Sequence, residues 1–117
     1  MEATGASILI VEDETMIAMM MADMLSDAGY RVSEAESPAA AFALIEQHGL
    51  PDLVISDQSM PGMTGTEMAG QLIERHGPMS VLITSGYAMG AEFAYPALQK
   101  PFAEADLLAK VRDLLGE

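Results

Sequence analysis

The spacing of hydrophobic residues switches repeatedly along the chain between a strand-like and a helix-like pattern. Continuous apolar runs, typical of strands buried on both faces of a sheet, occupy residues 7–11, 52–56 and 80–84. Shorter or weaker strand patterns lie at residues 30–34 and 96–99. Between them, helical spacing predicts helices over residues 14–28, 38–48, 66–76 and 103–115. Strands that alternate with helices predict a parallel sheet with helices on both faces.

Local signals indicate where several of these helices begin and end. Ser37 is a preferred N-cap residue, and Gly49 suits the end of the helix that follows it. Thr64 or Gly65 can start the next helix. The Gly- and Ala-rich stretch 85–96 has room for a short or irregular helix at most. We therefore expect an α/β fold in which one of the later helices, the fourth, is reduced.

The first helix is unusually rich in methionine. Its apolar residues at helical spacing, which we expect in the core, are Ile17, Met20, Met21, Met24, Leu25 and Ala28. Met16 falls off this stripe. A second set off the stripe combines small side chains with one methionine and comprises Thr15, Ala18, Met19 and Ala22. These four residues predict a shallow apolar patch suited to a helix of a partner protein.

Composition narrows the class of protein. The chain has 117 residues, of which 50% are hydrophobic and 20% charged, so we expect one packed domain over residues 1–117 without an output domain. A net charge of −13 argues against nucleic acid and against an anionic membrane surface as partners. The chain has no cysteine, no recognisable secretory signal and no apolar run of membrane-spanning length. These features favour a cytoplasmic protein.

Chemically active side chains follow four of the predicted strands. These strand ends carry Glu12-Asp13, Ser56-Asp57, Thr84-Ser85 and Gln99-Lys100. In an open parallel sheet, ligands bind beyond the carboxyl ends of the strands. The sequence therefore predicts one rim that holds three carboxylates, a hydroxyl and an ammonium group.

Four motifs at these strand ends resemble those of response-regulator receiver domains. They are Ile8-Leu9-Ile10-Val11-Glu12-Asp13-Glu14, Asp57 followed by Met60-Pro61-Gly62-Met63-Thr64-Gly65, Thr84-Ser85-Gly86, and Lys100-Pro101-Phe102. Each motif is weak alone, but the four in this order are specific, and the resemblance covers the whole chain. It implies a flavodoxin-like three-layer sandwich with a five-stranded parallel sheet in the order 2-1-3-4-5.

The resemblance also implies a role for each residue on the rim. Asp57 is the phosphoacceptor, and Mg²⁺, or Mn²⁺ in its place, is held directly by Asp13, Asp57 and the backbone carbonyl of Ser59. Glu12 acts mainly through a bound water. Thr84 and Lys100 each contact a phosphoryl oxygen, on the side of Asp57 away from the acidic pair. The bond between Lys100 and Pro101 is expected to be cis.

The function implied is that of a phosphoacceptor in two-component or phosphorelay signalling. A histidine kinase or a His-phosphotransfer domain would supply the phosphoryl group and dock on the first helix near Thr15, Ala18, Met19 and Ala22. Output would pass through contacts between proteins, from a monomer or weak dimer. The chain would not be an enzyme beyond catalysing its own phosphorylation and dephosphorylation.

The sequence departs from the family pattern at one position that matters for signalling. Typical receivers have an aromatic switch residue three positions before the lysine, where this chain has Ala97. The segment Thr84-Ser85-Gly86-Tyr87 resembles a subgroup that lacks this aromatic, and also receivers of hybrid histidine kinases. Tyr87 or Tyr95 is a hypothetical replacement. Small residues at positions 59 and 86 predict an open site and a short-lived phosphate.

Three other functions remain as alternatives. A phosphatase of the haloacid dehalogenase type needs a second Asp two residues after the nucleophile, where this chain has Ser59. A flavodoxin-like cofactor binder needs a phosphate-binding loop after the first strand, where Glu12-Asp13-Glu14 would repel the phosphate. The third is a receiver that is no longer phosphorylated and acts only as a docking module with the same fold.

Overall fold

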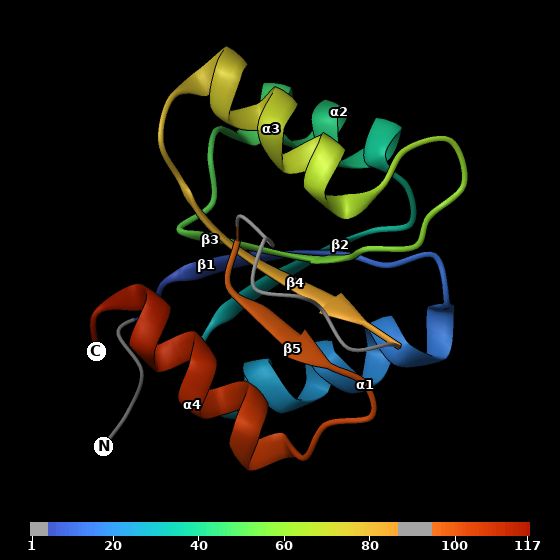
Figure 1. The fold of residues 1–117 in the computed structure, drawn as a ribbon. Helices are drawn as coiled ribbons and strands as arrows, with labels where there is room; N and C mark the ends of the chain where they lie inside the picture. The colour runs from blue at the N-terminus through green and yellow to red at the C-terminus, as the bar shows by residue number, and fades with distance from the viewer. Residues whose placement is uncertain (1–4, 87–94) are drawn as a thin grey trace.

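A computed structural model describes residues 5–86 and 95–117 (Figure 1). Its elements in chain order are β1 (Ser7–Val11), α1 (Thr15–Asp27), β2 (Arg31–Ala35), α2 (Pro38–His48), β3 (Leu53–Asp57), α3 (Gly65–His76), β4 (Ser80–Ser85), β5 (Ala97–Gln99) and α4 (Glu104–Leu115). The short or irregular helix expected within residues 85–96 falls largely on residues 87–94, outside the described ranges. Within those ranges, no helix has the length and hydropathy needed to cross a bilayer.

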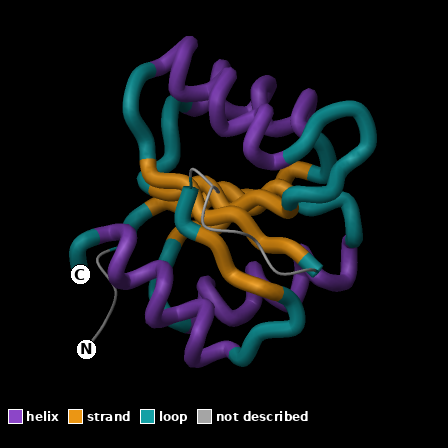
Figure 2. Tube along the Cα trace, viewed as in Figure 1, coloured by secondary structure: helices purple, strands orange, loops and turns teal. Residues whose placement is uncertain are grey.

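The five strands form one parallel sheet in the order β2-β1-β3-β4-β5, which is the order that the resemblance to receiver domains implied. Helices α2 and α3 cover one face of the sheet, and α1 and α4 cover the other (Figures 1 and 2). The fold is therefore the expected three-layer flavodoxin-like sandwich. This order sets the end of β3, the central strand, between the ends of β1 and β4.

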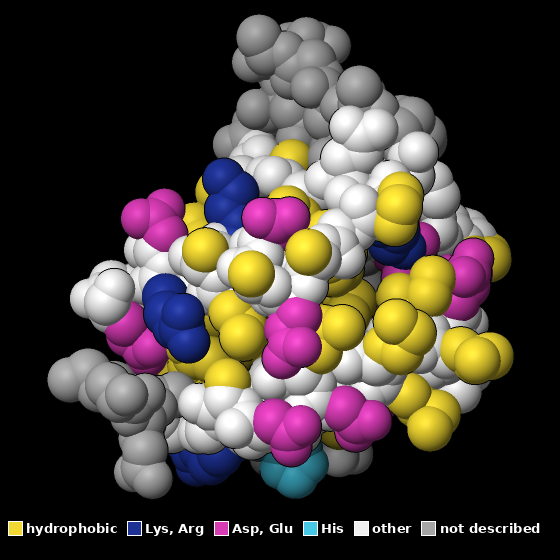
Figure 3. Space-filling view, turned by 90° about the horizontal axis from the view of Figure 1, so that it is seen from below, with side chains coloured by type: hydrophobic (Ala, Val, Ile, Leu, Met, Phe, Trp, Pro, Cys, Tyr) yellow, Lys and Arg dark blue, Asp and Glu magenta, His cyan; other side chains and the backbone are white. Residues whose placement is uncertain are grey.

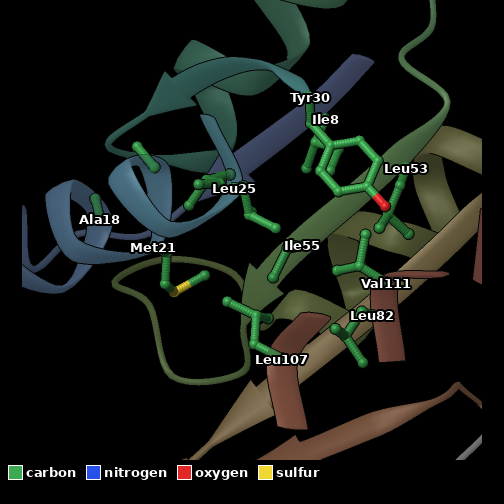
Figure 4. Close-up of a cluster of buried hydrophobic side chains, with 12 residues drawn as sticks. Ile8, Ala18, Met21, Leu25, Tyr30, Leu53, Ile55, Leu82, Leu107 and Val111 are labelled. Carbon is green, nitrogen blue, oxygen red and sulfur yellow. The ribbon is translucent and has the colours of Figure 1, made fainter. Parts of the chain in front are cut away.

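Successive residues of the inner strands feed two separate cores. Ile8 and Ile10 of β1 pack toward α1 and α4, whereas Leu9 and Val11 pack toward α2 and α3. The first of these cores also contains Leu107 of α4, and its side chains interlock between the sheet and the two helices (Figure 4). Because both faces of the inner strands are buried, the central residues of these strands are apolar. Burial of each such large side chain contributes about 1.5–3 kcal/mol.

Helix α1 turns most of the predicted residues toward the core: Met21 and Leu25 are buried, and Ile17, Met24 and Ala28 pack against them. Ala18 and Ala22 are buried with Met21, whereas Met20, predicted to lie in the core, is 55% exposed. Two overlapping stripes of this helix have helical spacing, and the pattern alone does not distinguish them. The buried face combines Ala18 and Ala22 with the predicted Met21 and Leu25, and Met16, Met19 and Met20 extend outward. The predicted docking patch was therefore wrong for Ala18 and Ala22.

Helix α3 begins at the N-cap Thr64, one of the two predicted starts. The Thr64 hydroxyl accepts a hydrogen bond from the Glu67 N–H, and the Glu67 carboxylate accepts one from the Thr64 N–H. This reciprocal pair satisfies backbone donors that have no partner inside the helix. The bond from the Thr64 backbone also lowers the pKa of Glu67. Ser37 caps α2 in a simpler way, through the Ala40 N–H.

The start of α3 lies directly against the end of β3. A Cβ atom added to Gly65 would lie 2.5 Å from the Asp57 carbonyl oxygen and 3.0 Å from the Ser56 Oγ. Any larger residue at position 65 would therefore displace the backbone of Asp57. The glycine allows the close packing that the rim of the sheet requires.

Candidate functional site

Three carboxylates converge at the carboxyl end of the sheet. Glu12 and Asp13 follow β1, Asp57 ends β3, and one ligand oxygen of each lies within 4.8 Å of the others. Glu12 and Asp57 are buried, whereas Asp13 is exposed. The neighbouring positions of β1 and β3 in the sheet bring these residues together, as the sequence predicted.

The ammonium group of Lys100 lies among these carboxylates. Its Nζ is 2.7 Å from Glu12 Oε1 and 3.4 Å from Asp57 Oδ1. The Lys100 backbone N–H donates to the Ser85 carbonyl, and the bond to Pro101 is cis, as predicted. We expected Lys100 on the side of Asp57 away from Glu12. The structure corrects that arrangement, because the long side chain reaches across and forms an ion pair with Glu12.

The electrostatics of the ion pair follow from its burial. Burial raises the pKa of Glu12, the charge of Asp57 adds to this effect, and the hydrogen bond from Lys100 opposes it. Burial also works against the charge of Lys100, but its bonds to Glu12 and the charges of Glu12 and Asp57 outweigh this, so the pKa of Lys100 is raised. The ammonium group is therefore retained at neutral pH.

Within residues 5–86 and 95–117, the hydroxyl group of Thr84 has no hydrogen-bond partner. Thr84 lies opposite Asp57 in the register of β3 and β4, and it is 1% exposed. Its Oγ1 is the one buried side-chain oxygen or nitrogen atom of the described residues without a hydrogen bond. Burial of an unpaired hydroxyl is unfavourable, so the site is built to receive an external donor or acceptor here.

The donor set fits a hard divalent cation. Three carboxylates face one ammonium group, and carboxylate oxygens are the ligands that Mg²⁺ prefers. Ser59, whose backbone carbonyl was a predicted ligand, lies two residues beyond Asp57 in the exposed part of the β3–α3 loop. A cation and an anionic phosphoryl group could share this rim, because Lys100 and Thr84 supply donors beside the acidic cluster.

Sequence patterns did not reveal two features of the site. One is the ion pair between Glu12 and Lys100, which are 88 positions apart. The other is Gln58, whose side-chain amide binds Thr66 across the β3–α3 loop. Neither has a local signal, because each depends on where the loops lie in space.

The tyrosines proposed to replace the switch aromatic have different outcomes. Tyr87 lies outside the described residues. Tyr95 packs against the cluster of Ala69, Val81 and Ile83. Since consecutive residues of a strand point to opposite faces, Tyr95 contacts the face of β4 away from Thr84. The replacement hypothesis stays a prediction, and direct contact of Tyr95 with Thr84 has no support from this packing.

The fold and this rim define the class of the protein. The sequence model of one protein family, the response regulator receiver domain, matches residues 8–112 of this chain. The chain therefore belongs to that family. It is a receiver domain of two-component signalling, and its acidic pocket fits a phosphoacceptor site.

Individual relatives come from several kinds of signalling protein. The sensor kinase CckA of Brucella abortus is 33% identical over 95% of this chain, which matches 13% of the kinase. The phosphate regulon regulator PhoB of Pseudomonas aeruginosa is 34% identical, with 95% of this chain matching 52% of the regulator. This chain thus spans about half of PhoB and a small part of CckA.

A solved structure is similar over nearly its whole length. The response regulator TrrA of Thermotoga maritima, in complex with Mg²⁺-BeF, superimposes with a TM-score of 0.84. The sequences are 28% identical, and the match covers 93% of this chain and 98% of TrrA.

Proposed function

We propose that Asp57 accepts a phosphoryl group with the help of a divalent cation. The observation that carries this proposal is the convergence of groups from four strand ends: two acidic side chains after β1, Asp57 of β3, Thr84 of β4 and Lys100 after β5. Glu12, Asp13, Asp57 and the Ser59 carbonyl would hold Mg²⁺, or Mn²⁺ in its place. The complex of TrrA with Mg²⁺-BeF supports this assignment.

The chemistry requires one bond to form and one to break. A carboxylate oxygen of Asp57 bonds to phosphorus while the bond from phosphorus to the imidazole nitrogen of a phosphohistidine breaks. The electron pair of the broken bond stays on that nitrogen. When bound, Mg²⁺ supplies positive charge that offsets the carboxylates and the phosphoryl oxygens.

Lys100 and Thr84 would supply the donors to the phosphoryl oxygens. The Lys100 ammonium lies 3.4 Å from Asp57, close to where a phosphoryl oxygen would carry negative charge. The unpaired Thr84 hydroxyl would donate to another oxygen and so gain the partner that it lacks. Donors that are already in position cost little reorganisation during the transfer.

A direct test is phosphorylation by a small donor. Purified protein is incubated with acetyl phosphate and Mg²⁺, and its intact mass is measured. We expect an added mass of one phosphoryl group, mapped by peptide analysis to Asp57, and no addition when EDTA removes the metal. Failure to gain mass with Mg²⁺ present would leave the chain as a receiver that only docks.

We also propose that the phosphohistidine-bearing partner docks on the exposed methionines of α1. Met16, Met19 and Met20 are 78%, 54% and 55% exposed. Hydrophobic side chains gather on this side of the molecule, which is seen from below in Figure 3. This surface replaces the predicted patch. Thr15 and Met19 belong to both surfaces.

A hollow lined by one of these methionines, Met20, extends to Lys100 beside the acceptor. It has a volume of about 430 Å³ and is lined by Ile17, Met20, Met21, Met24, Gly86, Lys100, Pro101 and Phe102. Because Lys100 also contacts Asp57, a helix seated here would hold its phosphohistidine close to the acceptor. The lining suits an apolar ridge on a helix of a four-helix bundle.

Met19→Glu tests this docking surface. We expect phosphotransfer from the cognate bundle to slow about tenfold, because a charge enters an apolar contact, while phosphorylation by acetyl phosphate stays unchanged. Rates of both reactions are measured side by side. Leu50→Glu is the matched control, since Leu50 is 42% exposed and lies before β3, at the opposite end of the sheet. Equal slowing by both donors would contradict the docking proposal.

A further inference from the structure

Gln58 connects three parts of the structure through four hydrogen bonds. Its backbone N–H donates to the Thr84 carbonyl at 2.8 Å, and its own carbonyl accepts from the Gly65 N–H at 3.1 Å. Its side-chain Oε1 accepts from the Thr66 N–H at 2.9 Å, and its Nε2 donates to Thr66 Oγ1 at 3.1 Å. The residue next to the phosphoacceptor therefore links β3 to β4 and to the first turn of α3.

The side-chain bonds of Gln58 close the base of the β3–α3 loop. Residues 58–64 form this loop, and Gln58 at its start bonds to Gly65 and Thr66 just past its end. The second residue of the loop is Ser59, whose carbonyl we assign to the cation. The position of that carbonyl depends on the backbone conformation just after Gln58. Loss of the Gln58 side-chain bonds would therefore shift the carbonyl oxygen.

The contact with Thr66 also belongs to a larger network. The Thr66 N–H is one of the first donors of α3, which have no partner inside the helix. Gln58 satisfies this donor, and Thr64 satisfies that of Glu67. The hydroxyls of Thr64 and Thr66 lie 3.2 Å apart and join the two caps. These hydrogen bonds therefore connect the far end of the loop to Gln58 at its start.

We propose that Gln58 is a positioning residue for the divalent cation, because its amide clamps the loop that carries the Ser59 carbonyl against the first turn of α3. The inference rests on the proposed cation site. An aliphatic side chain at position 58 would keep both backbone bonds and lose both side-chain bonds. Outer groups that orient metal ligands typically change metal affinity by about 10- to 100-fold.

Gln58→Met tests this role, because methionine keeps the length of the side chain and lacks the amide. Mg²⁺ affinity is measured by isothermal titration calorimetry at fixed pH and ionic strength, and the melting temperature is recorded without metal. We expect the Kd for Mg²⁺ to rise about tenfold. Thr66→Val removes one acceptor of the clamp and leaves the Thr66 N–H, so it should raise the Kd by a smaller factor.

The matched control separates positioning from general stability. Ser37→Ala removes the side-chain cap of α2, a helix that contributes no residue to the acidic cluster. It should lower the melting temperature and leave the Kd for Mg²⁺ within about twofold of wild type. Wild-type affinity in Gln58→Met, or an equal loss in Ser37→Ala, would overturn the positioning role. A wild-type protein that binds no Mg²⁺ would instead overturn the proposed cation site, and with it this inference.

Discussion

The Asp57→Asn protein is expected to take up no phosphoryl group from acetyl phosphate in the presence of Mg²⁺. Asparagine has nearly the same shape as aspartate, so the buried end of β3 keeps its packing. Its amide is uncharged and is not a nucleophile toward phosphorus. The change also removes one of the three carboxylates that would hold the cation, so Mg²⁺ affinity should fall as well. Intact mass spectrometry and calorimetry measure these two effects.

Asp52, which directly precedes β3, provides a control for this substitution. Asp52 is exposed and accepts a hydrogen bond from the Ser7 N–H. Asp52→Asn removes the same charge from the chain, and its phosphorylation should proceed at the wild-type rate. A phosphoryl group that still attaches to the Asp57→Asn protein, for example at Asp13, would contradict the assignment of the acceptor.

Lys100→Met is expected to slow phosphorylation by about 100-fold or more, because it removes a donor placed where negative charge develops. The same change should destabilise the metal-free protein by about 3 kcal/mol, since the Glu12 carboxylate loses its partner while 2% exposed. Added Mg²⁺ should raise the melting temperature of this variant more than that of wild type, because the ion restores positive charge beside Glu12. Rate measurements and thermal unfolding with and without Mg²⁺ check these effects.

The other lysine of the chain provides the comparison. Lys110 lies on α4, away from the acidic cluster, so Lys110→Met changes the net charge equally. It should leave both the rate and the Mg²⁺ dependence of stability close to wild type. If Lys100→Met were phosphorylated as fast as Lys110→Met, Lys100 would have no part in transfer, and its role would be confined to the ion pair with Glu12.

Local patterns in the sequence were sufficient to predict most of the helices and strands. The apolar run at residues 52–56 became β3 at Leu53–Asp57, and the helix expected after Ser37 ends before Gly49. Such signals are local, because a strand buried on both faces is read as a short run of mostly apolar residues, and a helix end needs a cap. The order of the strands came from the resemblance of four motifs to receiver domains, and the observed sheet agrees with it.

The sequence by itself determined which residues end the strands, and therefore which acids, hydroxyl and amine meet at one rim. Only the tertiary structure decided that Ala18 and Ala22 face the sheet while Met20 faces outward. It also decided that Lys100 pairs with Glu12, and that Gln58 forms hydrogen bonds with Thr66. The first choice depends on how closely α1 approaches the sheet, and the others depend on distances between side chains far apart or across a loop. Hydrophobic periodicity contains no information about such distances, because it records which face is apolar and not which atoms touch.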